Sequence, residues 1–317
     1  MPRPYKCRRR RKAATTLPHM PQHDRQVGSI RHCRAARLLV PVAGVVKAPT
    51  ILVFDSGLGG LTVFREIAKA RPDARYVYAA DDAFFPYGTR SEAALVERLC
   101  VLMGELLATH RPDIVVLACN TASTLVLPHL RERFHVPFVG TVPAIKPACA
   151  QSRSKRVTVL GTQATVNREY TRALIRDFSN GSEVALVGAA HLAQYAEAEL
   201  HGRAVEDRLI AAEIAPCFRN DGGRRTDTIV LACTHYPLLI DRLERLAPWP
   251  VTFIDPAPAI ARRVLDLSGP AAATETLIPA QAMFTSGQIP SEPLALALAR
   301  FGIGRATSQS RLPAPPR

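Results

Sequence analysis

Long apolar runs are missing from this chain of 317 residues. No run reaches the roughly 18 consecutive apolar residues of a membrane-spanning helix, which argues against a membrane protein. The hydrophobic fraction is nevertheless 47%, enough for the core of one large domain or two ordinary ones. We therefore expect a globular protein.

Paired cysteines are missing as well. The seven cysteines stand far apart, at positions 7, 33, 100, 119, 149, 217 and 233, and no C-x-x-C pair occurs. An odd and scattered set argues against a disulfide framework and against a zinc cluster. A reducing cytoplasm is the expected location.

Acidic residues are scarce at one end only. Residues 1–50 hold 12 lysines and arginines against one acid, Asp24, and so carry +11 of the net charge of +14. The rest of the chain is nearly neutral and gives no reason to invoke DNA or RNA. The run Arg8–Lys12 cannot pack, which predicts that residues 1–48 are a disordered extension, dispensable for fold and activity.

Two other interpretations of this extension stay open. The apolar stretch Leu38–Val46 resembles part of a signal peptide, but no small-residue cleavage site follows it. The arm could instead make the chain a nucleic-acid-associated binding protein. Truncation near Ala48 distinguishes an enzyme from such a binding protein, since catalysis should survive the loss of the arm and a binding role should not.

From residue 50 onward, apolar strands alternate with helical patterns. This alternation predicts an α/β protein with mainly parallel sheets and helices on both faces. Strands are expected at 51–54, 75–80, 114–118, 136–140, 156–160, 183–187, 228–232 and 251–254, and helices at 61–69, 91–110 and 166–178. The tail at 304–317 is expected to fray.

One internal similarity indicates where the candidate catalytic residues lie. The segments Asp113–Cys119 and Asp227–Cys233 align in register, and each is an apolar strand that delivers a cysteine followed by a threonine within two residues. Ligands of parallel sheets bind at the carboxyl ends of strands. A duplicated unit would place the two cysteines in equivalent positions.

Two matched thiols suit the inversion of a stereocentre. One thiolate removes the α-proton from one face, and the opposing thiol returns a proton from the other. Strand-end cysteines can also be small buried hydrophobes, and a cysteine hydrolase with His235 as base is the mechanistic rival, although it leaves the second cysteine unexplained.

Cofactor motifs are absent from the body of the chain. No Walker loop occurs, and Gly57–Gly60 does not have the G-x-G-x-x-G spacing. Pyridoxal phosphate needs a lysine, but Lys69, Lys146 and Lys155 do not lie at strand ends. We expect no cofactor and no metal.

Five motifs together resemble the bacterial glutamate racemases of the aspartate/glutamate racemase superfamily. They occur in family order within residues 51–290, at Phe54–Val63, Phe85–Ser91, Ala118–Ala122, Gly161–Val166 and Ala232–Leu239. The resemblance implies two pseudo-symmetric α/β domains, 51–143 plus 256–300 and 144–255, with the active site in the cleft between them. It also implies supply of D-glutamate for peptidoglycan, and it allows a homodimer. Aspartate racemase, or a related two-cysteine racemase or isomerase, is the alternative.

The resemblance also implies roles for individual residues. Cys119 and Cys233 match the acid/base thiols, Asp55 the carboxylate beside the first, and His235 the imidazole beside the second. Glu197 is the match for the partner of that imidazole, although the Cys-Pro pair that commonly precedes it is absent here. The implied contacts to glutamate are Asp55, Ser56, Tyr87, Gly88, Asn120, Thr121, Thr234 and His235.

Overall fold

The computed structural model describes residues 48–272 and 279–308. The predicted extension therefore lies, except for its last residue, outside the described residues, and so does the prediction that it is dispensable. Within the described residues, no helix is both long and apolar enough to cross a membrane.

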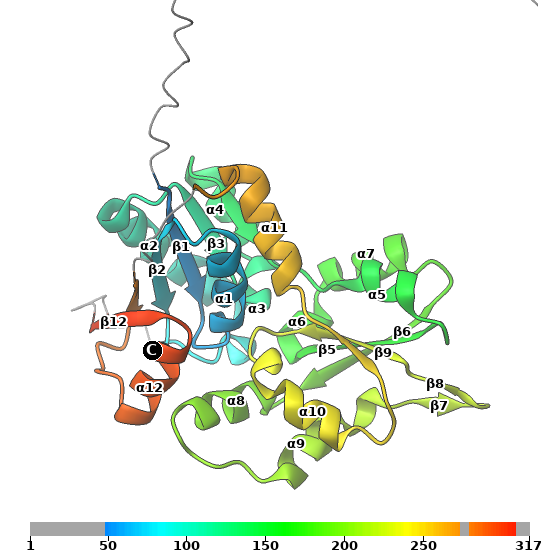
Figure 1. Cartoon of the computed structure of the whole chain (residues 1–317). Helices are drawn as coiled ribbons and strands as arrows, with labels where there is room; N and C mark the ends of the chain where they lie inside the picture. The colour runs from blue at the N-terminus through cyan, green and yellow to red at the C-terminus, as the bar shows by residue number, and fades with distance from the viewer. Residues whose placement is uncertain (1–47, 273–278, 309–317) are drawn as a thin grey trace, which may run out of the picture. The chain divides into compact units, whose positions relative to one another are not determined.

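Two parallel sheets organise the described chain (Figure 1). One has six strands in the order β12-β11-β2-β1-β3-β4, and the other has four in the order β10-β9-β5-β6. All strand pairs in both sheets are parallel, and only the small hairpin β7–β8 is antiparallel. The predicted α/β class with mainly parallel sheets is confirmed. The strands are β1 Thr50–Asp55, β2 Arg75–Ala80, β3 Ile114–Leu117, β4 Phe138–Gly140, β5 Arg156–Thr162, β6 Glu183–Ala189, β7 Asn220–Asp221, β8 Arg224–Arg225, β9 Thr228–Ala232, β10 Thr252–Ile254, β11 Ala280–Phe284 and β12 Ile303–Ser308.

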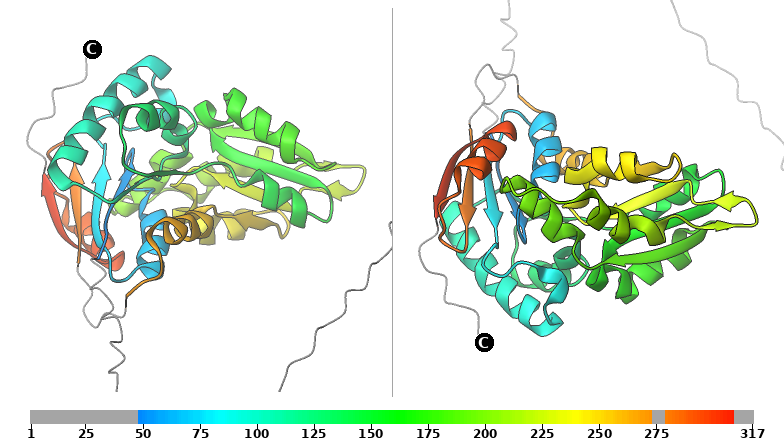
Figure 2. Two further views of the ribbon diagram at one scale, coloured as in Figure 1. Left: turned by 90° about the horizontal axis from the view of Figure 1, so that it is seen from above. Right: turned by 90° about the horizontal axis from the view of Figure 1, so that it is seen from below.

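Helices cover both faces of each sheet (Figure 2). They are α1 Leu61–Ala70, α2 Glu92–His110, α3 Asn120–Ser123, α4 Leu127–Arg133, α5 Ile145–Gln151, α6 Gln163–Asn167, α7 Glu169–Phe178, α8 Leu192–Leu200, α9 Asp207–Ile214, α10 Ile240–Leu246, α11 Ala257–Ser268 and α12 Glu292–Arg300, with short 3-10 turns at Tyr87–Thr89, Ala215–Cys217 and Tyr236–Leu239. Such two-sided burial explains why the parallel strands are continuous apolar runs.

Alternate residues of β1 show how the first sheet is packed. Ile51 and Val53 face a core shared with α1, α11 and α12, whereas Leu52 and Phe54 face α2, α3 and α4. In the second sheet, α5 and α7 pack on one face and α8, α9 and α10 on the other. Each sheet therefore has its own pair of cores.

The chain leaves the first sheet after β4 and returns to it at β11, after the whole second sheet has been made. The returning helix α11 packs with α1 on the first sheet. The first sheet is thus made of two separate stretches of the chain, while the domain limits that the resemblance implies stay a prediction.

Two details differ from the sequence-based expectation. The helix expected over 166–178 is two helices, because Arg168 is extended, with φ −69° and ψ 138°, and separates α6 from α7. Residues 304–308, which the sequence assigned to a frayed tail, instead belong to β12 and pair with β11. Residues 309–317 lie outside the described ranges.

Candidate active site

Each of the two matched cysteines lies within two residues of the end of the apolar strand that precedes it. Cys119 lies two residues beyond β3 in the six-stranded sheet, and Cys233 one residue beyond β9 in the four-stranded sheet. Both thiols are buried, at 5% and 6% exposure, and both line the same small cavity. The two half-sites thus face a common space.

Hydroxyl and carboxylate groups surround the first thiol. The Cys119 Sγ donates to Ser56 Oγ at 3.6 Å. Burial, with a further contribution from the negative charge of Asp55, raises the pKa of the Cys119 thiol to about 12. Cys119 is therefore a protonated thiol at neutral pH in this arrangement.

Asp55 ends β1 and is fully buried. Its Oδ2 accepts from the backbone N–H of Gly57 at 3.2 Å and of Gly60 at 3.0 Å, and its Oδ1 accepts from Thr234 Oγ1 at 3.3 Å. Burial raises the pKa of Asp55, although His235 and the two N–H donors oppose the shift. The carboxylate links the first sheet to the residue that follows Cys233.

An imidazole and a second carboxylate surround the other thiol. The Cys233 Sγ lies 3.8 Å from His235 Nδ1, and Glu197 Oε1 lies 2.8 Å from His235 Nε2. Burial opposes the charged imidazole, but Cys233 and Glu197 outweigh it and raise the pKa of His235 well above its usual value. The protonated ring can then donate to Cys233 on one side and to Glu197 on the other.

A glycine turn after β1 holds this group. The backbone N–H of Leu58 donates to Glu197 Oε1 at 2.6 Å, and that of Gly59 approaches His235 Nε2 at 3.2 Å. A Cβ at Gly57 would lie 2.2 Å from Glu197 Oε1, and one at Gly59 would lie 2.5 Å from His235 Nδ1. Only glycine fits here, because the turn of the first sheet touches side chains of the second.

Asn120 lines the cavity with an unpaired side chain. Both amide atoms of the Asn120 side chain are buried and have no hydrogen-bond partner. Since buried polar atoms are normally paired, this side chain is suited to a polar ligand. Beside it, the hydroxyls of Thr121, Thr162 and Thr165 lie 3.0–3.2 Å from one another and connect the two halves.

A model of the Asp/Glu/Hydantoin racemase family matches residues 55–264, a span that contains both thiols and all of these partners. The chain belongs to this racemase family. It is similar to the glutamate racemase of Brucella ovis, with 57% identity over 218 residues, which are 68% of this chain and 79% of that protein. The glutamate racemase of Brucella anthropi is 56% identical over 228 residues, 72% of this chain and 82% of that one.

A solved structure supports the same membership. The Escherichia coli glutamate racemase, in complex with L-glutamate and the activator UDP-MurNAc-Ala, is 38% identical, with a TM-score of 0.76. The match covers 84% of this chain and 100% of that one. The match includes both sheets of this chain, in agreement with the predicted fold class.

The structure brings the sequence-predicted site residues together. Those that line the cavity are Ser56, Tyr87, Gly88, Asn120, Thr121, Thr234, His235 and the two cysteines. Asp55 and Glu197 lie behind this lining, in contact with it through Thr234 and His235. The Tyr87 hydroxyl donates to Asp81 Oδ2 at 2.7 Å, so Tyr87 borders the cavity without offering it this hydroxyl.

Four further lining residues were not assigned to the site from the sequence, although the first three lie within the family motifs: Phe85, Pro86, Thr162 and Ala193. Thr162 could have been found, because it ends β5 in the same way that Asp55 ends β1. Phe85 packs on His235 with ring centroids 5.4 Å apart, a contact that no local pattern indicates.

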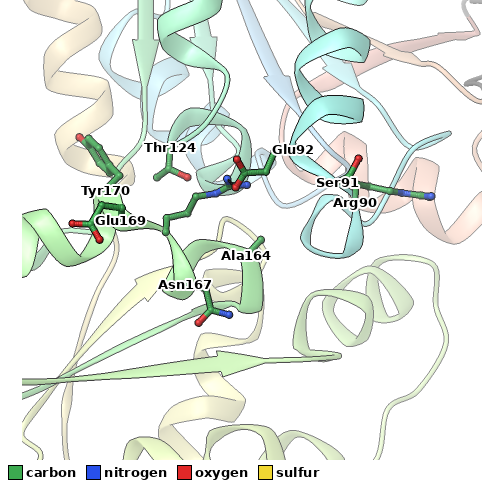
Figure 3. A pocket seen from close by; sticks show the side chains of 9 residues that line it. Arg90, Ser91, Glu92, Thr124, Ala164, Asn167, Glu169 and Tyr170 are labelled. Carbon is green, nitrogen blue, oxygen red and sulfur yellow. Dashed lines mark hydrogen bonds and ion pairs between the residues drawn. The ribbon is translucent and has the colours of Figure 1, made fainter.

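A second, open groove of about 440 Å³ lies between the start of α2 and the helices α6 and α7 (Figure 3). Glu92 and Arg168 form an ion pair across it. Arg90, which belongs to the motif Phe85–Ser91, lines this groove, and its guanidinium lies 4.5 Å from the centroid of the Phe84 ring. It is not among the residues that line the cysteine cavity.

The donor set of the site is that of an acid/base centre. Within residues 48–272 and 279–308, no group of three or more His, Cys, Asp or Glu side chains is arranged to hold a metal ion. Two thiols, an imidazole and two carboxylates around one cavity can instead store and move protons.

Proposed function

We propose that this chain interconverts L- and D-glutamate by a two-base mechanism without a cofactor, with Cys119 and Cys233 as the proton carriers. The observation that carries the proposal is the convergence of both buried thiols on one cavity from two separate sheets. Opposed bases of this kind can reach the two faces of a single α-carbon.

The reaction needs one thiolate and one thiol in each direction. The thiolate takes the α-proton, the electron pair stays on the α-carbon, and the opposing thiol delivers its proton to the other face. The enzyme then holds the thiolate on the opposite side, and the roles reverse for the other enantiomer. Each sulfur must lie within hydrogen-bond reach of the same carbon.

The surrounding residues assign a starting arrangement. With its raised pKa, Cys119 begins as the thiol and serves as the acid. Cys233 lies 3.8 Å from His235 Nδ1 and is, in this proposal, the first base. The ammonium group of a bound amino acid would favour thiolate formation on either side.

Substrate contacts in this proposal come from the unpaired Asn120 amide and from the hydroxyls of Ser56, Thr121 and Thr234, all of which border the cavity. The cavity holds about 20 Å³, room for about one water molecule. Glutamate can therefore enter only when part of the lining moves.

The wider assignments belong to the same proposal. Supply of D-glutamate for peptidoglycan follows from the proposed activity, and a cytoplasmic location suits two thiols that must stay reduced. The division of the strands between the two sheets supports the domain limits 51–143 plus 256–300 and 144–255, except that β12 extends the first domain beyond residue 300. A homodimer stays a prediction.

The test is to incubate the purified protein with L-glutamate and no added cofactor, and to measure D-glutamate by chiral chromatography. L-aspartate serves as the alternative substrate. We expect a kcat/KM preference for glutamate of at least ~10²-fold, because a substrate that is too short leaves polar groups of the closed site unpaired. Absence of D-glutamate, a preference for aspartate, or dependence on pyridoxal phosphate would contradict the proposal.

A further inference from the structure

Asp81 is a buried carboxylate that the proposed reaction does not use. It directly follows β2 and is fully buried. Its Oδ2 accepts from Tyr87 Oη at 2.7 Å and from Arg98 Nε at 3.2 Å. Its Oδ1 accepts from Arg98 Nη2 at 2.7 Å and from Thr285 Oγ1 at 2.7 Å. One carboxylate thus binds three separate parts of the chain.

Its partners surround one wall of the cysteine cavity. Residues 85–88, here called the wall segment, supply four of the residues that line this cavity. Tyr87 belongs to the segment, Arg98 to helix α2, and Thr285 follows β11. Asp81 therefore ties the wall segment to a helix and to a strand end, although it is not itself a lining residue.

A second contact fixes the beginning of the wall segment. The Phe84 backbone N–H donates to the Asp81 carbonyl at 3.0 Å, and the Phe84 ring packs against Tyr87 at 6.2 Å. The end of the wall segment lies close to the second sheet, since a Cβ at Gly88 would lie 3.3 Å from the Cβ of Thr162 in β5. The wall segment has little room to shift toward the second sheet, and Asp81 keeps it from shifting away.

We propose that Asp81 is a positioning residue that acts through Tyr87 to hold the wall segment, and that it thereby sets the preference for glutamate over the shorter aspartate. This inference rests on the proposed function. Hydrogen bonds to a buried ionised group are the strong ones, and this carboxylate accepts four. An asparagine at this position offers one oxygen, so donors now bound to the other oxygen lose their acceptor.

The test compares Asp81→Asn and Tyr87→Phe with the control Asp82→Asn. Asp82 is the neighbouring carboxylate and accepts from the Ser286 backbone N–H at 2.8 Å. It therefore holds the same strand end as Asp81 without a bond to Tyr87. For each protein, kcat and KM for L-glutamate are measured, together with the ratio of kcat/KM for L-glutamate and L-aspartate.

We expect Asp81→Asn to raise KM for L-glutamate and to lower the glutamate-to-aspartate ratio by about 10-fold or more, within the range that one methylene spans. The effect on kcat should be smaller, because the two thiols follow β3 and β9, whereas Asp81 holds the wall segment. Tyr87→Phe should change both values in the same direction by less, and Asp82→Asn should leave both unchanged. The ratio is the decisive value, since it does not depend on the fraction of folded enzyme.

The outcomes separate this inference from the proposed function. A wild-type protein that does not convert glutamate contradicts the proposed function. A wild-type protein that converts it, with an unchanged KM and ratio in Asp81→Asn, overturns the role of Asp81. An Asp82→Asn variant as impaired as Asp81→Asn overturns it too. Should Asp81→Asn fail to fold, Tyr87→Phe decides, and wild-type values there overturn the inference.

Discussion

The surroundings of Cys119 and Cys233 are built on similar strands but carry opposite charges. Each segment begins with an aspartate that secures the start of its strand. Asp113 accepts from the Thr50 backbone N–H at 2.7 Å, and Asp227 accepts from the Ser154 backbone N–H at 2.7 Å. Beyond the strands, Cys119 meets Ser56 and a carboxylate, whereas Cys233 meets an imidazole.

This difference teaches that the two half-sites are built on equivalent strands but have unequal charged groups beside their thiols. Asp55 contributes to the raised pKa of Cys119, while the protonated His235 offers a donor to Cys233. L- and D-glutamate have equal free energies in solution, so kcat/KM must be the same in both directions. The inequality of the half-sites can therefore appear only in kcat and KM taken separately.

Removing either thiol should have the largest effect on racemisation. We expect Cys119→Ser and Cys233→Ser each to lose at least ~10²-fold in racemisation, because each thiol is the only proton carrier on its face. Chiral chromatography of reactions with L- and D-glutamate measures the loss. Near-normal turnover in either variant contradicts the two-base mechanism.

The same variants show which face each thiol serves. A protein with one functional thiol can still exchange the α-proton of the enantiomer that faces it, without inversion. In deuterated water, each variant should therefore label one enantiomer of the substrate, and the two variants should label opposite enantiomers. Labelling of both enantiomers by one variant would mean that another base acts.

Displacing the imidazole should have the next largest effect. A Cβ at Gly59 would lie 2.6 Å from the backbone N and 2.5 Å from the Nδ1 of His235, and backbone cannot yield as a side chain can. We expect Gly59→Ala to lower kcat/KM about 10²-fold, the cost of a displacement of about 1 Å in a catalytic group. The control is Gly104→Ala on α2, whose Cβ would meet Phe134 at an ordinary 3.7 Å. Equal activities for both variants would contradict a close fit between the glycine turn and His235.

Glu197→Gln acts on the Cys233 half-site through His235 and leaves the contact between Cys119 and Ser56 in place. It removes the charged partner of His235, and a hydrogen bond to a charged group contributes ~1.5–3 kcal/mol, so we expect a loss of about 10-fold in kcat/KM. Glu199→Gln is the matched control on the same helix, because Glu199 pairs with Arg242 away from the cavity. Steady-state kinetics of both variants measure the difference. A full rate in Glu197→Gln would mean that His235 needs no acidic partner.

Part of the candidate site could be found from strand positions, because Asp55 and the two cysteines lie at or just beyond the ends of strands that the sequence reveals. Tyr87, Gly88 and Glu197 were found only through the family resemblance, since none of them ends a strand. Apolar runs such as Ile114–Leu117 and Thr228–Ala232 are strands buried on both faces, and the polar residues after them gather at one edge of each sheet. Thr162 and Asp81 follow the same rule and could have been included.

Long-range contacts explain what the sequence did not predict. The extended backbone of Arg168 breaks a helix without proline or glycine at that position. β11 joins its sheet by pairing with β2, about 200 residues earlier in the chain, and its sequence Ala280–Phe284 has no β-branched residue. The Tyr87 hydroxyl turns to Asp81 because a buried carboxylate is there to accept it, which only the folded chain shows.

The smallest expected effect is on stability, and it tests the proton affinity of the Cys119 half-site directly. Burial raises the pKa of Cys119 to about 12, from an ordinary value near 9. The folded state therefore holds the thiol proton more tightly than the unfolded state. The thiol proton therefore stabilises the folded state fully below pH 9, and this contribution to the free energy of unfolding is lost as the pH rises toward 12.

Within that window, the free energy of unfolding should fall by up to about 1.4 kcal/mol per pH unit for each such thiol. Cys217, whose pKa is raised to about 12 by burial alone, gives the matched comparison away from the cavity. Urea unfolding between pH 9 and 10.5 should thus show a shallower decline in Cys119→Ser and in Cys217→Ala than in the wild type. Other groups that titrate in this range contribute equally to all three proteins, so the difference in slope isolates each thiol. A Cys119→Ser slope equal to that of the wild type would mean that the unliganded site already holds Cys119 as a thiolate, and that the two half-sites do not differ in the way their charges indicate.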